Sequence, residues 1–181
     1  MSISNKVVLL TGASKGIGRQ LALTLAGIGN HLALVARSEA ELLTLQAECE
    51  QKGSKCLIFV GNVSDESLVK KAVSDTLAAF GHIDFMINNA GYGIFGPTES
   101  YSAEQWSDMY DTNVKGTFLF CKEVLESMKA AGSGYIINVA SDVAKRVFDG
   151  GALYCSSKFA QDAFSAALDR KSTRLNSSHV D

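Results

Sequence analysis

The chain has 181 residues, of which 46% are hydrophobic and 20% are charged, and its formal net charge is −2. This composition is typical of a globular protein with one substantial core, and the length suits a single domain. The charge balance gives no support for binding to nucleic acid or to an anionic membrane surface.

Cysteine spacing and the first apolar run indicate the compartment. The four cysteines form no CxxC pair and no cluster with histidine; they are Cys49, Cys56, Cys121 and Cys155. We therefore expect reduced thiols in a cytoplasmic protein and no metal site. The apolar run near the N-terminus follows no basic segment, and it is too short for a secretory leader or a membrane span.

Apolar runs alternate along the chain with segments of helical spacing. The sequence predicts strands at residues 6–10, 31–36, 55–63, 83–88 and 134–140. It predicts helices at residues 17–28, 38–53, 64–81, 103–130 and 152–168. Ser38 and Ser64 are expected to begin their helices, and Gly53 is expected to end one.

The strands indicate the architecture. Each is a continuous apolar run rather than an alternating one, which is typical of a parallel sheet that is covered on both faces. Right-handed crossovers then predict a doubly wound α/β fold with a ligand at the carboxyl ends of the strands.

The chain changes character after Leu168. The segment DRKSTRLNSSHVD is polar and loses the apolar period. It has the composition of a disordered terminus, and it also resembles the translation of a common sequencing adapter. We therefore predict that residues 1–168 form the domain, that residues 169–181 are a non-native tail, and that the natural protein continues beyond Leu168.

A glycine-rich segment, TGASKGIG, connects the first strand to the first helix at Thr11–Gly18. Such a turn allows the backbone to approach a pyrophosphate, which the N–H groups and dipole of the helix then favour. The spacing differs from GxGxxG, and a tight turn without a ligand is an alternative.

The segment resembles the TGxxxGxG loop of the short-chain dehydrogenase/reductase family, whose other motifs follow in order. They are NNAG at Asn88–Gly91, the asparagine of YDTNVKG at Asn113, Ser141, and Tyr154 with Lys158 in YCSSK. Ser141 and Tyr154 are thirteen residues apart, the interval usual in the family. The motifs are similar to those of 3-oxoacyl-(acyl carrier protein) reductases. The resemblance implies a Rossmann-type domain that is incomplete at its C-terminus.

The cofactor is predicted from the end of the second strand. An acid there would bond the ribose 2′-hydroxyl of NAD, whereas this chain has Ala36 followed by Arg37. The guanidinium suits a 2′-phosphate, and Lys15 adds charge, so we expect NADP(H). Asn62 stands where relatives commonly carry Asp, and its amide oxygen can accept from adenine. The expected cofactor contacts are Gly12, Ser14, Lys15, Gly16, Ile17, Gly18, Arg37, Asn62, Val63, Asn89, Ala90, Gly91, Tyr154 and Lys158.

The resemblance implies reduction of a ketone by hydride transfer. Lys158 follows Tyr154 by one helical turn, so its ammonium favours the phenolate and prepares Tyr154 as the proton donor. Ser141 is expected to bond the substrate carbonyl. Lys158 is expected to bond the nicotinamide ribose, and Asn113 to hold a water that relays protons.

Other functions remain open from the sequence. The chain could be an NADP(H) sensor without catalysis, although such a protein would need neither Ser141 nor Tyr154. It could also be an inactive fragment that lacks the sixth and seventh strands, leaving the fifth strand uncovered. Phe95, Val147 and Phe148 suggest a partly apolar substrate pocket. The resemblance implies a homodimer or homotetramer for the full-length parent.

Overall fold

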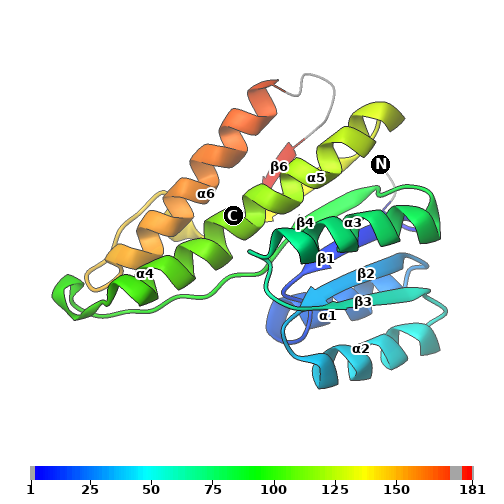
Figure 1. Cartoon of the computed structure of the whole chain (residues 1–181), viewed down its shortest axis with the longest axis horizontal. Coiled ribbons are helices and arrows are strands. Elements are labelled where there is room, and N and C mark those ends of the chain that lie inside the picture. Colours follow the sequence, from blue (N-terminus) through cyan, green and yellow to red (C-terminus); the bar gives the residue numbers. More distant parts are fainter. Residues whose placement is uncertain (1–2, 172–176, 181) are drawn as a thin grey trace.

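The computed structural model describes residues 3–171 and 177–180, and it contains a parallel sheet with helices on both faces (Figure 1). The strands are β1 (Val7–Thr11), β2 (His31–Ala36), β3 (Cys56–Val60), β4 (Phe85–Asn88), β5 (Tyr135–Val139) and β6 (Ser177–Val180). The helices are α1 (Gly16–Ala26), α2 (Glu39–Gln51), α3 (Glu66–Phe80), α4 (Ala103–Tyr110), α5 (Gly116–Ala131) and α6 (Ala152–Lys171). None of these helices combines the length and the apolar character that a membrane crossing requires.

The strand order confirms the predicted doubly wound fold. It runs β3-β2-β1-β4-β5-β6, and every neighbouring pair is parallel. The chain builds outward from β1 in one direction and then crosses to β4 to build in the other. The carboxyl ends of β1 and β4 therefore flank the point where such sheets bind their ligands.

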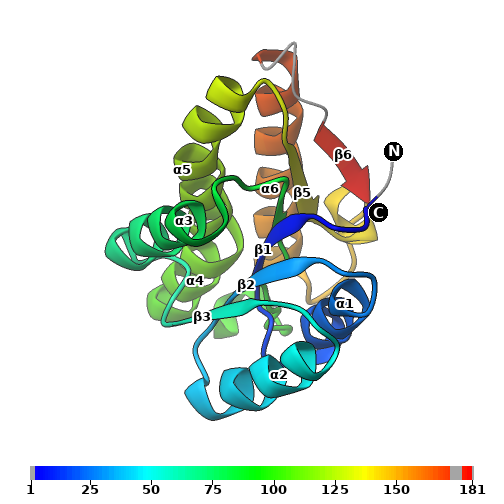
Figure 2. The same cartoon turned by 90° about the vertical axis from the view of Figure 1, so that its right-hand side faces the viewer.

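The continuous apolar strands have a simple explanation, because both faces of the sheet are covered. Leu9 of β1 packs with α3 and α5, whereas its neighbours Val8 and Leu10 pack with α1 and α2 on the opposite face. Figure 2 shows α1 and α2 on one side of the sheet and α3 and α5 on the other. Alternate side chains of a strand point to opposite faces, so both sets must be apolar here.

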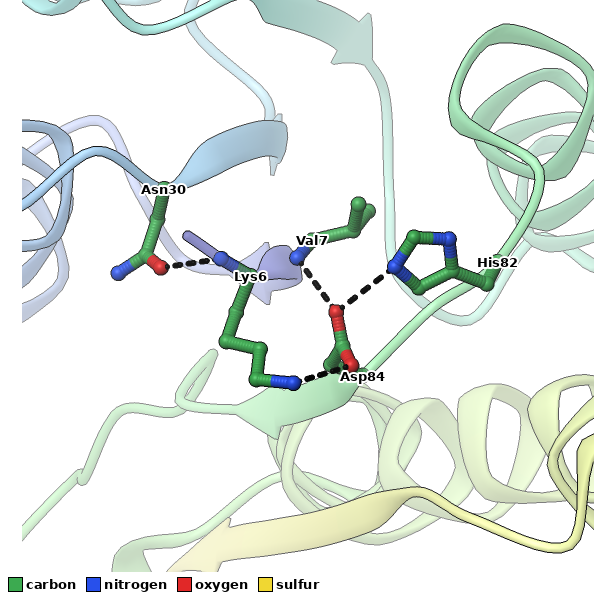
Figure 3. Close-up of polar contacts among 5 residues, drawn as sticks. All are labelled: Lys6, Val7, Asn30, His82 and Asp84. Carbon is green, nitrogen blue, oxygen red and sulfur yellow. Dashed lines mark hydrogen bonds and ion pairs between the residues drawn. The ribbon is translucent and has the colours of Figure 1, made fainter. Parts of the chain in front are cut away.

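A polar cluster fixes the amino ends of the central strands (Figure 3). Asp84 accepts from the backbone N–H of Val7 at 2.8 Å, and it pairs with Lys6 at 3.1 Å and with His82 at 3.0 Å. Asn30 accepts from the backbone N–H of Lys6 at 2.7 Å. These contacts hold β1 against β4 and β2 at the edge opposite to the predicted ligand site.

The predicted helical region 103–130 is confirmed, and it contains a π-helical turn that the sequence does not predict. A π-helical turn, Asp111–Lys115, separates α4 from α5. Its central residue, Asn113, donates to the carbonyl of Tyr92 at 2.9 Å and accepts from the N–H of Tyr92 at 3.0 Å. The extra residue of the wider turn directs this side chain at the chain after β4, and such bulges are frequent at functional sites.

Two expectations, about the start of α3 and about the edge of the sheet at β5, are corrected. Helix α3 begins at Glu66, and its N-cap is Asp65 rather than Ser64, because the Asp65 carboxylate accepts from the N–H of Ser67 at 2.8 Å. The fifth strand is not uncovered, because β6 pairs with it in parallel. An exposed strand edge can pair through its backbone with any extended segment, whatever the side chains. The origin of residues 169–181 remains a prediction.

Candidate active site

The glycine-rich turn is shaped first by its contacts within the chain. Gly12 and Gly16 have positive φ angles of 66° and 56°, which favour glycine. A Cβ on Gly12 would lie 2.8 Å from Ala90 Cα, and a Cβ on Gly18 would collide with the carbonyl oxygen of Gly12. A Cβ on Gly16 would meet nothing within 4 Å. Gly12 and Gly18 are thus required by the fold of the turn itself.

Helix α1 begins with a backbone end that is available to an anion. Lys15 occupies the N-cap position but makes no side-chain cap hydrogen bond, and the first turn contains no acidic residue. The first N–H groups of a helix have no partner within it, and the helix dipole is positive there. This end of α1 therefore suits phosphate oxygens.

The NNAG segment joins the turn to the rest of the sheet. Asn89 Nδ2 donates to the carbonyls of Thr11 at 3.1 Å and Gly12 at 3.2 Å, and Thr11 Oγ1 accepts from Asn89 N at 3.0 Å. Asn88 Nδ2 donates to Asn138 Oδ1 at 2.8 Å, between the paired strands β4 and β5. These side chains hold the wall of the site in place.

Tyr154 and Lys158 lie one turn apart on α6. The Lys158 ammonium is 6.0 Å from the centroid of the Tyr154 ring. It donates to the carbonyl of Val139 at 3.1 Å and to Gln161 Oε1 at 2.9 Å. Burial lowers the pKa of Lys158 from 10.5 to about 8, because the charged form loses its hydration.

Asn113 lies beside this lysine, whereas Ser141 faces elsewhere. A Cβ on Gly91 would lie 3.2 Å from Asn113 Oδ1 and 3.4 Å from Lys158 Nζ, so both groups border Gly91. The Ser141 hydroxyl donates to Asp142 Oδ1 at 3.1 Å and accepts from the N–H of Val143 at 3.4 Å. In this arrangement Ser141 caps the 3₁₀ turn Asp142–Ala144.

One cavity of about 530 Å³ collects nearly all of the predicted residues. All fourteen residues expected to contact the cofactor line it, from Gly12 to Lys158. Asn113 and Ser141 do not line it, although their neighbours Thr112 and Ala140 do. The cavity lies at the carboxyl ends of the strands, as the fold predicts.

The cavity also contains residues that the sequence did not reveal. Glu41, in the first turn of α2, lines it together with Arg37, so a carboxylate shares the region where a 2′-phosphate was expected. Asn62 Oδ1 accepts from the N–H of Ser64 at 3.1 Å, in a turn that Asp or Asn can form equally. The same oxygen keeps a second lone pair, which can accept from adenine.

Two loops beside Tyr154 carry exposed aromatic rings. Phe95 is 60% exposed, and its centroid lies 5.5 Å from that of Tyr154 and 5.7 Å from that of Phe148. The Tyr101 hydroxyl lies 2.8 Å from the carbonyl oxygens of both Gly96 and Gly150, one from each loop. The Tyr101 hydroxyl therefore links the two loops, and the rings of Phe95 and Phe148 lie close to Tyr154.

Comparison with known proteins gives a consistent result. The family model described as short chain dehydrogenase matches residues 6–176. The chain is 34% identical to the sepiapterin reductase of Chlorobaculum tepidum over 162 residues, which are 86% of this chain and 66% of that protein. The chain thus spans less than two thirds of the length of this curated relative.

Solved structures with the same arrangement include ligand complexes. An alcohol dehydrogenase from the archaeon Thermococcus sibiricus, complexed with 5-hydroxy-NADP, has a TM-score of 0.92 and 32% identity, covering 96% of this chain and 74% of that one. An NAD⁺-bound xylitol dehydrogenase has a TM-score of 0.91 and 33% identity, covering 99% of this chain and 70% of that one.

Proposed function

The chain belongs to the short chain dehydrogenase family, and we propose that it binds NADP(H) and, within its parent protein, reduces a ketone to a secondary alcohol. The observation that carries this proposal is the single cavity that joins the glycine-rich turn to Tyr154 and Lys158. A dinucleotide needs an anion site and a reaction site at opposite ends of one pocket, and the residues that line this cavity support both roles.

The residues present fit such a cofactor. The free backbone end of α1 suits the pyrophosphate, and Arg37 and Lys15 add two cations for a further phosphate. Glu41 opposes that phosphate, so the preference for NADP over NAD depends on the balance between Arg37 and Glu41. The related structures described above include both an NADP derivative and NAD⁺.

The chain's own residues then manage the proton and the substrate oxygen. The bound cofactor would supply the hydride. Tyr154 would donate its phenolic proton to the carbonyl oxygen, and the adjacent Lys158 ammonium would stabilise the phenolate that remains. Ser141 would turn from Asp142 and donate to the same oxygen, where negative charge develops.

Replacing Tyr154 by Phe tests this assignment. We expect Tyr154→Phe to bind NADPH with a Kd within about threefold of the wild type and to lose at least about 100-fold in kcat, because general acid catalysis contributes about 10²–10⁴-fold. Tyr110→Phe is the matched control, since Tyr110 stacks on Trp106 and does not line the cavity. Both variants are compared by NADPH fluorescence titration and by NADPH oxidation. Near-normal turnover by Tyr154→Phe would refute the role.

For the substrate, we propose a ketone with an apolar body, with a 3-oxoacyl thioester as the leading candidate. Phe95 and Phe148 offer exposed ring faces beside Tyr154, and aromatic faces bind apolar groups well. Wild-type protein is assayed against cyclic ketones, aryl ketones, sugars and 3-oxoacyl thioesters. Activity on sugars alone would refute an apolar substrate, and activity on aryl ketones without thioesters would refute the thioester.

We also propose that the parent protein is a cytoplasmic homodimer or homotetramer. Four free thiols among the described residues fit a reducing compartment. Phe118, Leu125 and Phe164 line an apolar depression between α5 and α6, and such surfaces often mark subunit contacts. Light scattering on wild type and on Phe118→Asp tests this, and a monomer at all concentrations would refute it.

A further inference from the structure

The Lys158 ammonium, besides lying near Tyr154, donates to two acceptors of the protein. An ammonium has three N–H donors. One is used by the carbonyl of Val139 at 3.1 Å and another by Gln161 Oε1 at 2.9 Å. Lys158 is only 5% exposed, so these protein acceptors replace water around most of the charge. A single N–H remains for groups in the cavity.

Gln161 is itself fixed from its other end. It is 1% exposed, and its Nε2 donates to Thr117 Oγ1 of α5 at 3.0 Å. The Thr117 hydroxyl donates in turn to the carbonyl of Asn113 at 3.1 Å. A continuous chain of hydrogen bonds therefore connects Lys158 to the π-helical turn.

The position of Gln161 is unusual for a packed helix face. Residues at this spacing along α6 that face the core would ordinarily be apolar, because a buried amide must be fully paired to avoid a desolvation cost. Here the buried residues of α6 include Leu153 and Cys155 near its start, but also the polar Ser157, Lys158, Gln161 and Ser165. An apolar side chain would fill the same space at lower cost, so the amide needs another explanation.

We infer that Gln161 is a positioning residue: its amide group links Lys158 to Thr117 and aims the ammonium at the cavity. The inference rests on the proposed function, because it gives Lys158 a cofactor and a phenol to serve. Without the Gln161 oxygen, the ammonium retains Val139 as its acceptor and can rotate away from the cavity. The cofactor would then lose a preoriented donor.

The test compares two substitutions of similar size in the full chain. Gln161→Met keeps the volume but loses both the strong acceptor and the donor, whereas Gln161→Glu keeps an acceptor next to Lys158 and loses only the donor to Thr117. We expect Gln161→Met to raise the Kd for NADPH at least fivefold and to lower kcat about tenfold. We expect Gln161→Glu to stay within threefold of the wild type in both. If Gln161 only packed the core, the order would be reversed, because Met is the milder change for an apolar site.

A second pair of variants covers the case in which Gln161→Glu does not fold. Thr117→Val removes the hydroxyl that fixes Gln161, and we expect the Kd for NADPH to rise about threefold. Thr76→Val is the matched control, because Thr76 is equally buried and its hydroxyl also bonds a carbonyl one turn back, that of Ala72, in α3. Equal Kd values for the two threonine variants would overturn the inference.

The same data separate this inference from the proposed function. A parent protein that fails to bind NADPH or to oxidise it with any ketone refutes the proposed function, and the inference with it. Wild-type protein that does both, with Gln161→Met unchanged in Kd and kcat, refutes only the role of Gln161.

Discussion

Replacing Lys158 by Met tests whether the buried Lys158 ammonium lowers the free energy of unfolding. Burial lowers the pKa of Lys158 from 10.5 to about 8. At about 1.4 kcal/mol for each pH unit, this difference corresponds to about 3 kcal/mol by which the folded state disfavours the ammonium at neutral pH. This cost from one side chain is large, because the free energy of unfolding of a folded protein is only about 5–15 kcal/mol.

The sign of the pH dependence follows from the same two values. Below pH 8, Lys158 is protonated in both states, and the folded protein bears the full cost. Between pH 8 and 10.5 the unfolded chain binds more protons than the folded one, so the contribution of Lys158 to stability rises with pH. The contribution of Lys158 to stability is complete above pH 10.5, decreases as the pH falls from 10.5 to 8, and is absent below pH 8.

Urea unfolding of wild type and Lys158→Met at pH 7, 8, 9 and 9.5 measures this contribution. Other titrating groups affect both proteins and cancel in the difference. We expect the free energy of unfolding of wild type, relative to the variant, to increase by about 2 kcal/mol between pH 7 and 9.5. Two parallel curves would show that the ammonium is not destabilised by burial, and the reasoning would fail.

Two further predictions concern the cofactor end of the cavity. Arg37→Asp is expected to lower the ratio of kcat/KM for NADPH over NADH at least tenfold, because a cation that pairs with the phosphate becomes a repulsive charge. Lys70→Asp makes the same charge change on α3, outside the cavity, and should leave the ratio unaltered. Equal effects of the two variants would place the 2′-phosphate elsewhere. Gly18→Ala should destabilise the protein by about 1–3 kcal/mol in urea, because its Cβ would collide with the carbonyl of the first glycine of the turn. Gly27→Ala, at φ −65° with no contact under 3.4 Å, should be neutral or stabilising, and equal losses in both would contradict the packing argument.

The fold was predictable because local signals and tertiary packing agree. The five predicted strands are present, since a run such as Val7–Leu10 can be buried on both faces only in a covered parallel sheet. The boundaries were less predictable where side chains act over long distances. The strand predicted from residue 83 begins at Phe85, and Asp84 just before it uses its carboxylate to accept from the N–H of Val7 in β1.

The residues that line the cavity were predictable for a different reason. Its residues follow strand ends in the sequence, and a parallel sheet brings those ends together. Glu41, which lines the cavity, and Gln161, which accepts from Lys158, were not found, because each lies on a helix whose rotation depends on packing. The π-helical turn was missed too, since its cause is the pairing of Asn113 with Tyr92, a residue 21 positions away.

The buried polar groups explain how the two halves of the site are kept in register. Asn89 joins the glycine-rich turn to β4, Asn88 joins β4 to Asn138 of β5, and Asn138 Nδ2 donates to Ser165 of α6 at 2.7 Å. Each of these bonds crosses between elements that are distant in sequence. Buried amides have few alternative partners, so a shift of α6 along the sheet would leave several of them unpaired at once. These hydrogen bonds therefore oppose a shift of α6 that would change the distance between the anion end of the cavity and Tyr154.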